Sequence, residues 1–156
     1  MHTGSCLCGG ISFSSGDLPP IVVCCCSQCR RAQGGPVGTN VPISEASFSL
    51  SDPEQLLQSY ESSPGKRRCF CRRCGSPVMA RRDSAPGVVR IRAGLIKEPI
   101  CSELAWHLHA ASKCNWCPST MIYLNILKPM CHLAPPNASL HPPRYGWLAS
   151  PAYAHG

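Results

Sequence analysis

The chain has 156 residues, with thirteen cysteines, sixteen prolines and a formal net charge of +7 at pH 7. This length suits one domain with a modest core that gains stability from metal ions or disulfides. The start of the chain lacks a basic segment followed by an apolar run, and no stretch has the length of a membrane span. We therefore expect a cytoplasmic protein with no membrane partner, where clustered cysteines are more often metal ligands than disulfides.

Short alternating or β-branched segments separated by Gly and Pro turns predict a succession of short strands. The expected strands are residues 10–14, 21–23, 37–43, 46–50, 57–61, 88–93 and 104–110. Residues 68–71 lead into the second cysteine knuckle, and residues 78–80 follow it. Ser51-Asp-Pro-Glu54 has the spacing of a capping box, which predicts a single helical turn there. With almost no helical periodicity elsewhere, the pattern predicts a mainly β domain.

The character of the chain changes after Trp116. Residues 118–156 contain seven prolines and no acidic residue, and only 121–127 could add a strand. We therefore expect a zinc domain at residues 1–117 and a divergent, proline-rich tail at 118–156.

Seven cysteines fall in three closely spaced groups. They are Cys6 and Cys8, then Cys24, Cys26 and Cys29, and then Cys71 and Cys74. Residues i and i+2 of a strand point to one face, and a Cys-x-x-Cys-Gly turn aims both sulfurs inward, so each pair can form half of a metal site. The first and last groups together would form a closed four-thiolate zinc site. The middle group would then hold a second zinc with three thiolates and one open position, as catalytic zinc sites do.

Spacing alone leaves alternatives open. Cys69, His107 or His109 would close the middle site by supplying a fourth ligand, and other pairings of the half-sites also satisfy tetrahedral zinc. Both histidines are more often polar strand residues than ligands or bases. Cys114-Asn-Trp-Cys117 is a further Cys-x-x-Cys pair, which in so cysteine-rich a chain is more often incidental than redox-active or ligating.

Basic residues are concentrated in one part of the chain. Ten of the fifteen lysines and arginines lie between Lys66 and Lys97, where Asp83 is the only acid. Such a stripe attracts a small anionic substrate, an anionic lipid or nucleic acid, and it can also be a solvated face of a basic protein. No nucleic-acid motif accompanies it and aromatic residues for base stacking are few, so nucleic acid is not the expected partner.

At its cysteine motifs the chain resembles the glutathione-dependent formaldehyde-activating enzyme family, which includes centromere protein V. The resemblance extends over about residues 3–116 and rests on Gly4-Ser-Cys-Leu-Cys-Gly9, Cys24-Cys-Cys-Ser-Gln-Cys-Arg30, Tyr60-Glu-Ser-Ser-Pro-Gly-Lys-Arg67 and Phe70-Cys-Arg-Arg-Cys-Gly-Ser-Pro77. Family members often have histidine where this chain has Cys25.

The resemblance implies a β-tent fold of twisted antiparallel sheets with two zinc ions per chain. Carried over position by position, it implies a structural zinc held by Cys6, Cys8, Cys71 and Cys74. The catalytic zinc would be held by Cys24, Cys26 and Cys29.

The activity implied by the resemblance is the addition of glutathione to formaldehyde, which gives S-hydroxymethylglutathione and is a carbon–sulfur lyase reaction in reverse. An open zinc site suits this chemistry, because metal coordination deprotonates a thiol and polarises an aldehyde oxygen. Arg30, Arg31 and the basic residues of 66–82 are candidates to pair with the two carboxylates of glutathione. The alternative hypothesis is a non-catalytic zinc module whose basic surface binds a protein or nucleic-acid partner.

Overall fold

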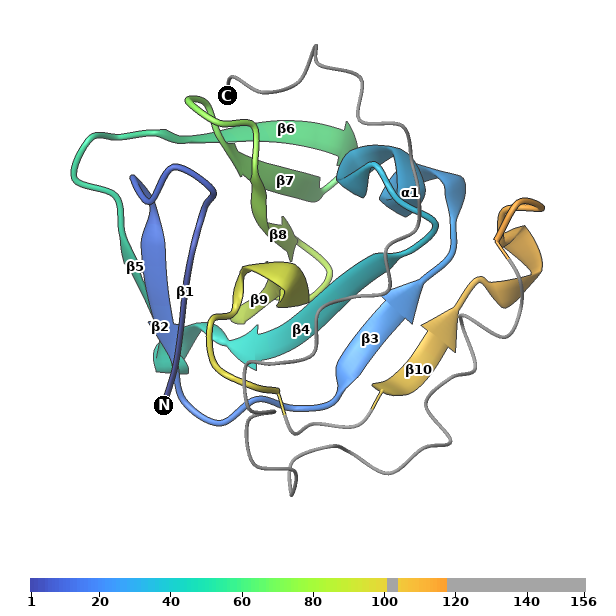
Figure 1. Ribbon diagram of the computed structural model, residues 1–156, viewed down its shortest axis with the longest axis horizontal. Helices are drawn as coiled ribbons and strands as arrows, with labels where there is room; N and C mark the ends of the chain where they lie inside the picture. The colour runs from blue at the N-terminus through green and yellow to red at the C-terminus, as the bar shows by residue number, and fades with distance from the viewer. Residues whose placement is uncertain (101–103, 118–156) are drawn as a thin grey trace, which may run out of the picture.

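The computed structural model describes residues 1–100 and 104–117 and is shown in Figure 1. Its strands are β1 (His2–Ser5), β2 (Ser12–Ser15), β3 (Ile21–Cys24), β4 (Gly38–Ser44), β5 (Phe48–Ser51), β6 (Leu57–Ser63), β7 (Lys66–Cys71), β8 (Pro77–Arg82), β9 (Val88–Arg92) and β10 (Leu104–Leu108). Its helical segments are α1 (Ser27–Gln33) and the short 3-10 turns η1 (Glu45–Ser47), η2 (Ala93–Leu95) and η3 (Ala110–Ser112).

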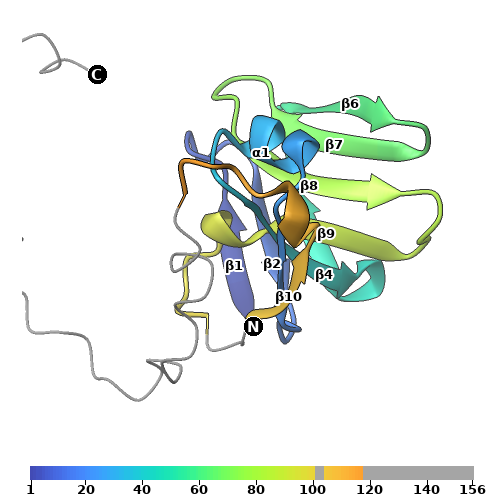
Figure 2. The same cartoon turned by 90° about the vertical axis from the view of Figure 1, so that its right-hand side faces the viewer.

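The strands form two sheets, which confirms the mainly β fold class. One sheet has three strands in the order β1-β2-β5, and the other has seven in the order β10-β3-β4-β9-β8-β7-β6. Figure 2 shows β6 to β9 stacked in the large sheet, with the small sheet beside it. Neighbouring strands pair antiparallel except at one edge, where β10 runs parallel to β3. Strand periodicity does not encode such a pairing between segments far apart in the chain.

The hydrophobic core is built from strand faces of both sheets. Phe13 of β2, Val41 and Ile43 of β4, and Val89 and Ile91 of β9 are all buried in one cluster. Because successive strand residues point to opposite faces, the alternate residues of β4 and β9 lie on the other side of the large sheet. That second face carries the site described below.

The elements that were not predicted from the sequence include β1 and α1. β1 precedes the first expected strand and pairs with β2. The helix α1 begins after Cys26, whose Sγ accepts a hydrogen bond from the backbone N–H of Cys29, and it ends at Gly34, where φ is +64°. Its sequence lacks an apolar stripe because it is short and contributes only Cys29 to the buried residues.

Three expectations were wrong. The strand expected at 46–50 begins only at Phe48, because Glu45–Ser47 forms η1. The segment Ser51–Glu54 forms no helix; the backbone N–H of Gln55 donates to the carbonyl of Asp52, and the Asp52 carboxylate accepts bonds from residues beyond the turn. The last strand ends at Leu108 rather than residue 110, since His109 has a φ of +56°. The candidate strand at 121–127 lies outside the described residues. No helix among the described residues is long and apolar enough to cross a membrane.

Candidate metal sites and a cationic cavity

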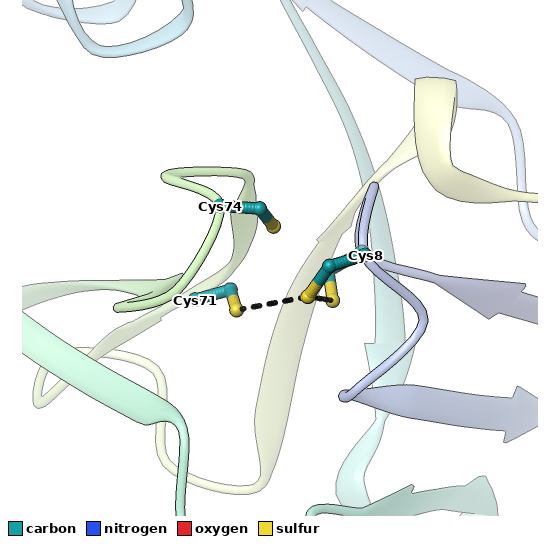
Figure 3. A group of neighbouring side chains, drawn as sticks. Cys8, Cys71 and Cys74 are labelled. Atoms are coloured by element: carbon teal, nitrogen blue, oxygen red, sulfur yellow. Dashed lines mark hydrogen bonds between the residues drawn. The ribbon is translucent and has the colours of Figure 1, made fainter. Parts of the chain in front are cut away.

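The first cysteine cluster consists of Cys6, Cys8, Cys71 and Cys74, whose sulfur atoms all lie within 4.8 Å of one another. The Cys6 and Cys8 sulfurs are 3.5 Å apart, and those of Cys8 and Cys71 are 3.8 Å apart. Figure 3 shows Cys8, Cys71 and Cys74 converging, with a dashed line between the Cys8 and Cys71 sulfurs. Zn–S bonds of about 2.3 Å in a tetrahedron place sulfurs roughly 3.8 Å apart, so this donor set fits zinc.

Two turns bring these four sulfurs together. The N–H of Gly9 donates to the carbonyl of Cys6 at 3.0 Å, and the N–H of Gly75 donates to the carbonyl of Cys71 at 2.8 Å. Gly75 has a φ of +74°, which glycine adopts without strain. Cys6 and Cys8 therefore converge through a turn after β1, and not as alternate residues of a strand, as we had expected. The result is the same because a tight turn also aims both sulfurs inward.

Hydrogen bonding lowers the pKa of one cysteine of this cluster, Cys74. The Ser76 hydroxyl lies 3.3 Å from the Cys74 sulfur, and this hydrogen bond, the largest of several effects, lowers the pKa of Cys74 to about 5. A thiol with such a pKa is a thiolate at neutral pH, which is the form that binds metal ions.

The second cysteine cluster consists of Cys24, Cys26 and Cys29, whose sulfur atoms also lie within 4.8 Å of one another. Cys24 ends β3, Cys26 caps α1 and Cys29 lies in its first turn, so a strand end and a helix start define the cluster. The Cys24 and Cys26 sulfurs are 3.5 Å apart. The guanidinium of Arg68 on β7 donates to the Cys29 sulfur at 3.8 Å, which ties the cluster to the large sheet.

The thiols of the second cluster differ in acidity. Burial raises the pKa of Cys24 to about 12. Burial also acts to raise the pKa of Cys26, but hydrogen bonds from the backbone of Cys29 and the side chain of Cys24 outweigh it, and the pKa lies below its ordinary value. A divalent cation would stabilise all three thiolates and reverse the shift at Cys24.

Among the described side chains, no fourth Cys, His, Asp or Glu atom joins the second cluster within that distance. Cys69 is buried in the core instead, and His109 lies at the mouth of a cavity next to the cluster. The side chain of His107 is outside the described part of the structure. Of the three candidate fourth ligands, the structure thus brings neither Cys69 nor His109 to the cluster.

A cavity of about 300 Å³ opens beside the second cluster, and Cys24 and Cys29 form part of its wall. Five cationic side chains also line it, and none of its lining residues within the described part of the chain is acidic. These cations are Lys66, Arg68, Arg82, Arg90 and Arg92. We call this space the cationic cavity.

Strand alternation explains why the cations gather there. Arg90 and Arg92 of β9 point away from the core, because Val89 and Ile91 between and beside them point into it. Lys66 and Arg68 of β7 and Arg82 of β8 share the same sheet face. Arg90 and Arg92 belong to the basic stripe but not to the residues that the sequence nominated as carboxylate partners, although the alternation of residues 88–93 indicates a common face for them.

Three of the basic residues on the opposite face or in the turns have acidic partners. Arg67 pairs with Asp83 at 2.9 Å and Arg81 pairs with Glu45 at 2.5 Å. Arg73 pairs with Glu54. Of the ten basic residues of the stripe, three thus have acidic partners and five line the cationic cavity.

Two other predicted groups lie away from this cavity. Arg30 and Arg31 of α1 border a separate, shallower pocket next to Trp116, so the structure does not bring them to the cationic cavity. Cys114 and Cys117 are both buried and are not part of either cluster. All eleven described cysteines are free thiols.

Comparisons with known proteins agree with this fold. A crystal structure of a Rhodobacter sphaeroides protein, a Northeast Structural Genomics target, is 21% identical in sequence, with a TM-score of 0.51 over 67% of this chain and 98% of that chain. This likeness bears on the fold alone. None of the curated proteins compared with the chain matches it. The family model described as glutathione-dependent formaldehyde-activating enzyme matches residues 1–112, and the chain therefore belongs to that family.

Proposed function

We propose that this protein is a zinc-dependent enzyme of the carbon–sulfur lyase type. It would add a small thiol such as glutathione to an aldehyde such as formaldehyde, or reverse that addition. The observation that carries the proposal is the second cluster, where three converging cysteine sulfurs border the cationic cavity. A cavity large enough for a small ligand beside three converging sulfurs fits a site with an exchangeable fourth position better than a closed structural site.

The assignment of zinc rests on the donor sets. Four thiolates suit a structural zinc site, and three thiolates suit a site with one exchangeable position. We assign the structural ion to Cys6, Cys8, Cys71 and Cys74. Cys24, Cys26 and Cys29 would hold the second ion as the catalytic group. Once bound there, zinc supplies an open position that acidifies a thiol and polarises a carbonyl oxygen.

The reaction is a simple addition. The substrate sulfur forms a bond to the aldehyde carbon, the carbonyl π-bond breaks towards oxygen, and the thiol proton ends on that oxygen. The chain contributes by holding the reactants in the cationic cavity. His109 lines the cavity and is a candidate to exchange the proton with solvent, which would give this residue a role that the sequence did not favour.

The adduct also forms spontaneously, so catalysis shows only in the rate at which the adduct forms and breaks down. Exchange NMR measures this rate and therefore tests the activity. We expect zinc-loaded protein to accelerate exchange between free and S-hydroxymethyl glutathione by at least about tenfold over buffer. Cys26→Ala should abolish the acceleration. Cys25→Ala is the matched control, because Cys25 is the adjacent buried cysteine but lies in neither cluster. Equal rates for wild type, Cys26→Ala and buffer would contradict the proposal.

The alternative, a non-catalytic zinc module with a basic binding surface, has less support. Such a surface needs outward-facing cations, and three of these, Arg67, Arg73 and Arg81, already have acidic partners. A steep dependence of nucleic-acid binding on salt would favour the module. The cytoplasmic location stays a prediction that agrees with the reduced thiols the proposal requires.

A further inference from the structure

We infer that the cationic cavity is an anion-binding site. It selects substrates that carry a carboxylate or phosphate group close to the reacting centre. The inference deepens the proposed function and rests on it for the identity of the reacting thiol. It names the substrate class as small anionic thiols, and it excludes neutral or cationic thiols of the same size as good substrates.

The first observation is the imbalance of charge. Five cations line the cavity, and no acidic residue accompanies them among the residues that the structure describes. These cations are Lys66, Arg68, Arg82, Arg90 and Arg92. Three cysteine thiolates with one divalent cation carry a net charge of −1, and a bound substrate thiolate would bring the total to −2. Five cations opposite two negative charges leave a surplus of three. A neutral substrate would leave this surplus in a partly dehydrated space.

The second observation is that two of the guanidinium groups are buried and incompletely bonded. Arg92 is 4% exposed and Arg68 is 8% exposed. Within the described residues, Nε of Arg92 and Nη1 of Arg68 are buried and have no hydrogen-bond acceptor, and Nη1 of the partly buried Arg90 also has none. Buried donors are almost always satisfied in folded proteins, so these atoms point to an acceptor that the chain itself does not supply.

The third observation is that neutral partners hold both guanidinium groups in place, in addition to the bond from Arg68 to the Cys29 sulfur. The Asn40 side-chain oxygen accepts a hydrogen bond from Nη1 of Arg92, and Asn40 is anchored in turn by donating to the carbonyl of Gly38 at 3.2 Å. The Ser62 hydroxyl accepts from Nε of Arg68 at 3.0 Å. Neutral anchors fix the orientation of a cation and leave its charge available to a ligand.

Arg92 remains charged at neutral pH despite its burial. Burial, followed by the nearby charge of Arg68, lowers the pKa of Arg92 to about 10. Burial and the charge of Arg68 also lower the pKa of Lys66. Mutual repulsion of this kind is relieved when an anion binds between the cations, so the site gains most from a compact group with several acceptor oxygens.

Calorimetric titration of zinc-loaded protein with matched thiols tests the inference without relying on turnover. 3-Mercaptopropionate, 2-mercaptoethanol and cysteamine have similar size and differ in charge. We expect 3-mercaptopropionate to bind at least about tenfold more tightly than 2-mercaptoethanol, as charge-assisted hydrogen bonds to arginine provide. Cysteamine should bind most weakly. Equal affinity for the three thiols would overturn the inference.

Variants localise the preference. Arg92→Met and Arg68→Met should reduce the ratio of the first two affinities to about one, because methionine keeps the apolar bulk and removes the donors. Arg67→Met is the matched control, since Arg67 lies on the same strand as Arg68 but faces away and pairs with Asp83. An unchanged ratio in both cavity variants would overturn the inference. If either variant is unstable, the more exposed Arg90→Met replaces it, with the same expectation.

Inorganic phosphate and a charged aldehyde separate the possible outcomes. Phosphate should compete with 3-mercaptopropionate in wild type and not in Arg92→Met. If the protein accelerates adduct exchange for neutral thiols with glyoxylate but not with formaldehyde, the aldehyde is the substrate that carries the anionic group. This result would overturn the assignment of that group to the thiol. Selective binding of anionic thiols without any acceleration of adduct exchange would support the anion-binding site and refute the proposed function. Equal acceleration of exchange for anionic, neutral and cationic thiols would support the proposed function and refute the anion-binding site.

Discussion

Asp52 is the residue whose replacement should show most clearly how the loop before β6 supports the first cysteine cluster. Its carboxylate accepts hydrogen bonds from the backbone N–H of Leu56 at 2.7 Å and of Leu57 at 2.9 Å. Leu57 pairs with Cys71 across β6 and β7, and the carbonyl of Leu56 accepts from the N–H of Arg72 at 2.9 Å. Asp52 therefore orders the segment against which the Cys71–Cys74 turn is built.

Asp52→Ala removes both bonds and leaves two backbone donors without their acceptor. Hydrogen bonds to a charged group contribute about 1.5–3 kcal/mol each in favourable cases, and Asp52 is half-buried, so the lower values apply. We expect a loss of about 2 kcal/mol in the free energy of unfolding. For a chain of this size, that lowers the melting temperature by roughly 6 °C.

Thermal unfolding of the zinc-loaded protein, followed by circular dichroism, measures the effect. Asp52→Asn keeps an acceptor oxygen and should lie between wild type and Asp52→Ala. Asp17→Ala is the control, because Asp17 is an exposed acid in a turn. We also expect Asp52→Ala to weaken zinc binding at the first cluster and not at the second. A melting temperature of Asp52→Ala within 1 °C of Asp17→Ala, an interval of roughly 0.3 kcal/mol, would refute this reasoning.

Three further predictions concern packing, pH and metal. Gly4→Ala would place a Cβ 2.2 Å from the Phe13 ring and 2.6 Å from the Leu95 carbonyl, so urea unfolding should show a loss of about 3 kcal/mol; a neutral effect would contradict this packing. Hydrogen bonds from the hydroxyl and then the backbone N–H of Thr3 lower the pKa of Glu98 to about 2. A carboxyl group with a lowered pKa stabilises the fold at pH values above the pKa of a free glutamate, and this stabilisation is lost as the pH falls towards 2. The difference in urea midpoint between wild type and Glu98→Gln should therefore shrink from pH 6 to pH 3. A constant difference would contradict this prediction. Removal of metal by a chelator should lower the melting temperature of wild type, and adding zinc should restore the original melting temperature. An unchanged melting temperature after chelation would contradict a stabilising metal.

Much of the strand pattern could be predicted because short strands with one buried face leave a period of two in the sequence. The segments 37–43 and 88–93 show it well, since alternate residues such as Val41 and Ile91 pack in the core. The helix α1 escaped prediction because its seven residues serve to position Cys29 and carry no apolar stripe. The parallel pairing of β10 with β3 escaped it because local sequence says nothing about which distant strand becomes a neighbour.

For the candidate site, the spacing of the cysteines carried more information than their local conformation. The grouping of Cys6 and Cys8 with Cys71 and Cys74 agrees with the geometry, although we expected a strand where the chain forms a turn. The cationic cavity was only partly predictable. Its cations come from three neighbouring strands, and their order in the sheet, which the sequence does not reveal, decides which of them meet.

The content of zinc in protein purified under reducing conditions tests the two-site account most directly. Metal analysis should give two zinc ions per chain for wild type, one for Cys26→Ser with the fold intact, and two for the control Cys25→Ala. This outcome would place one ion at the second cluster and leave the four-thiolate site occupied. A single zinc or none in wild type, unchanged by Cys26→Ser, would contradict the two-site account and the enzyme function built on it.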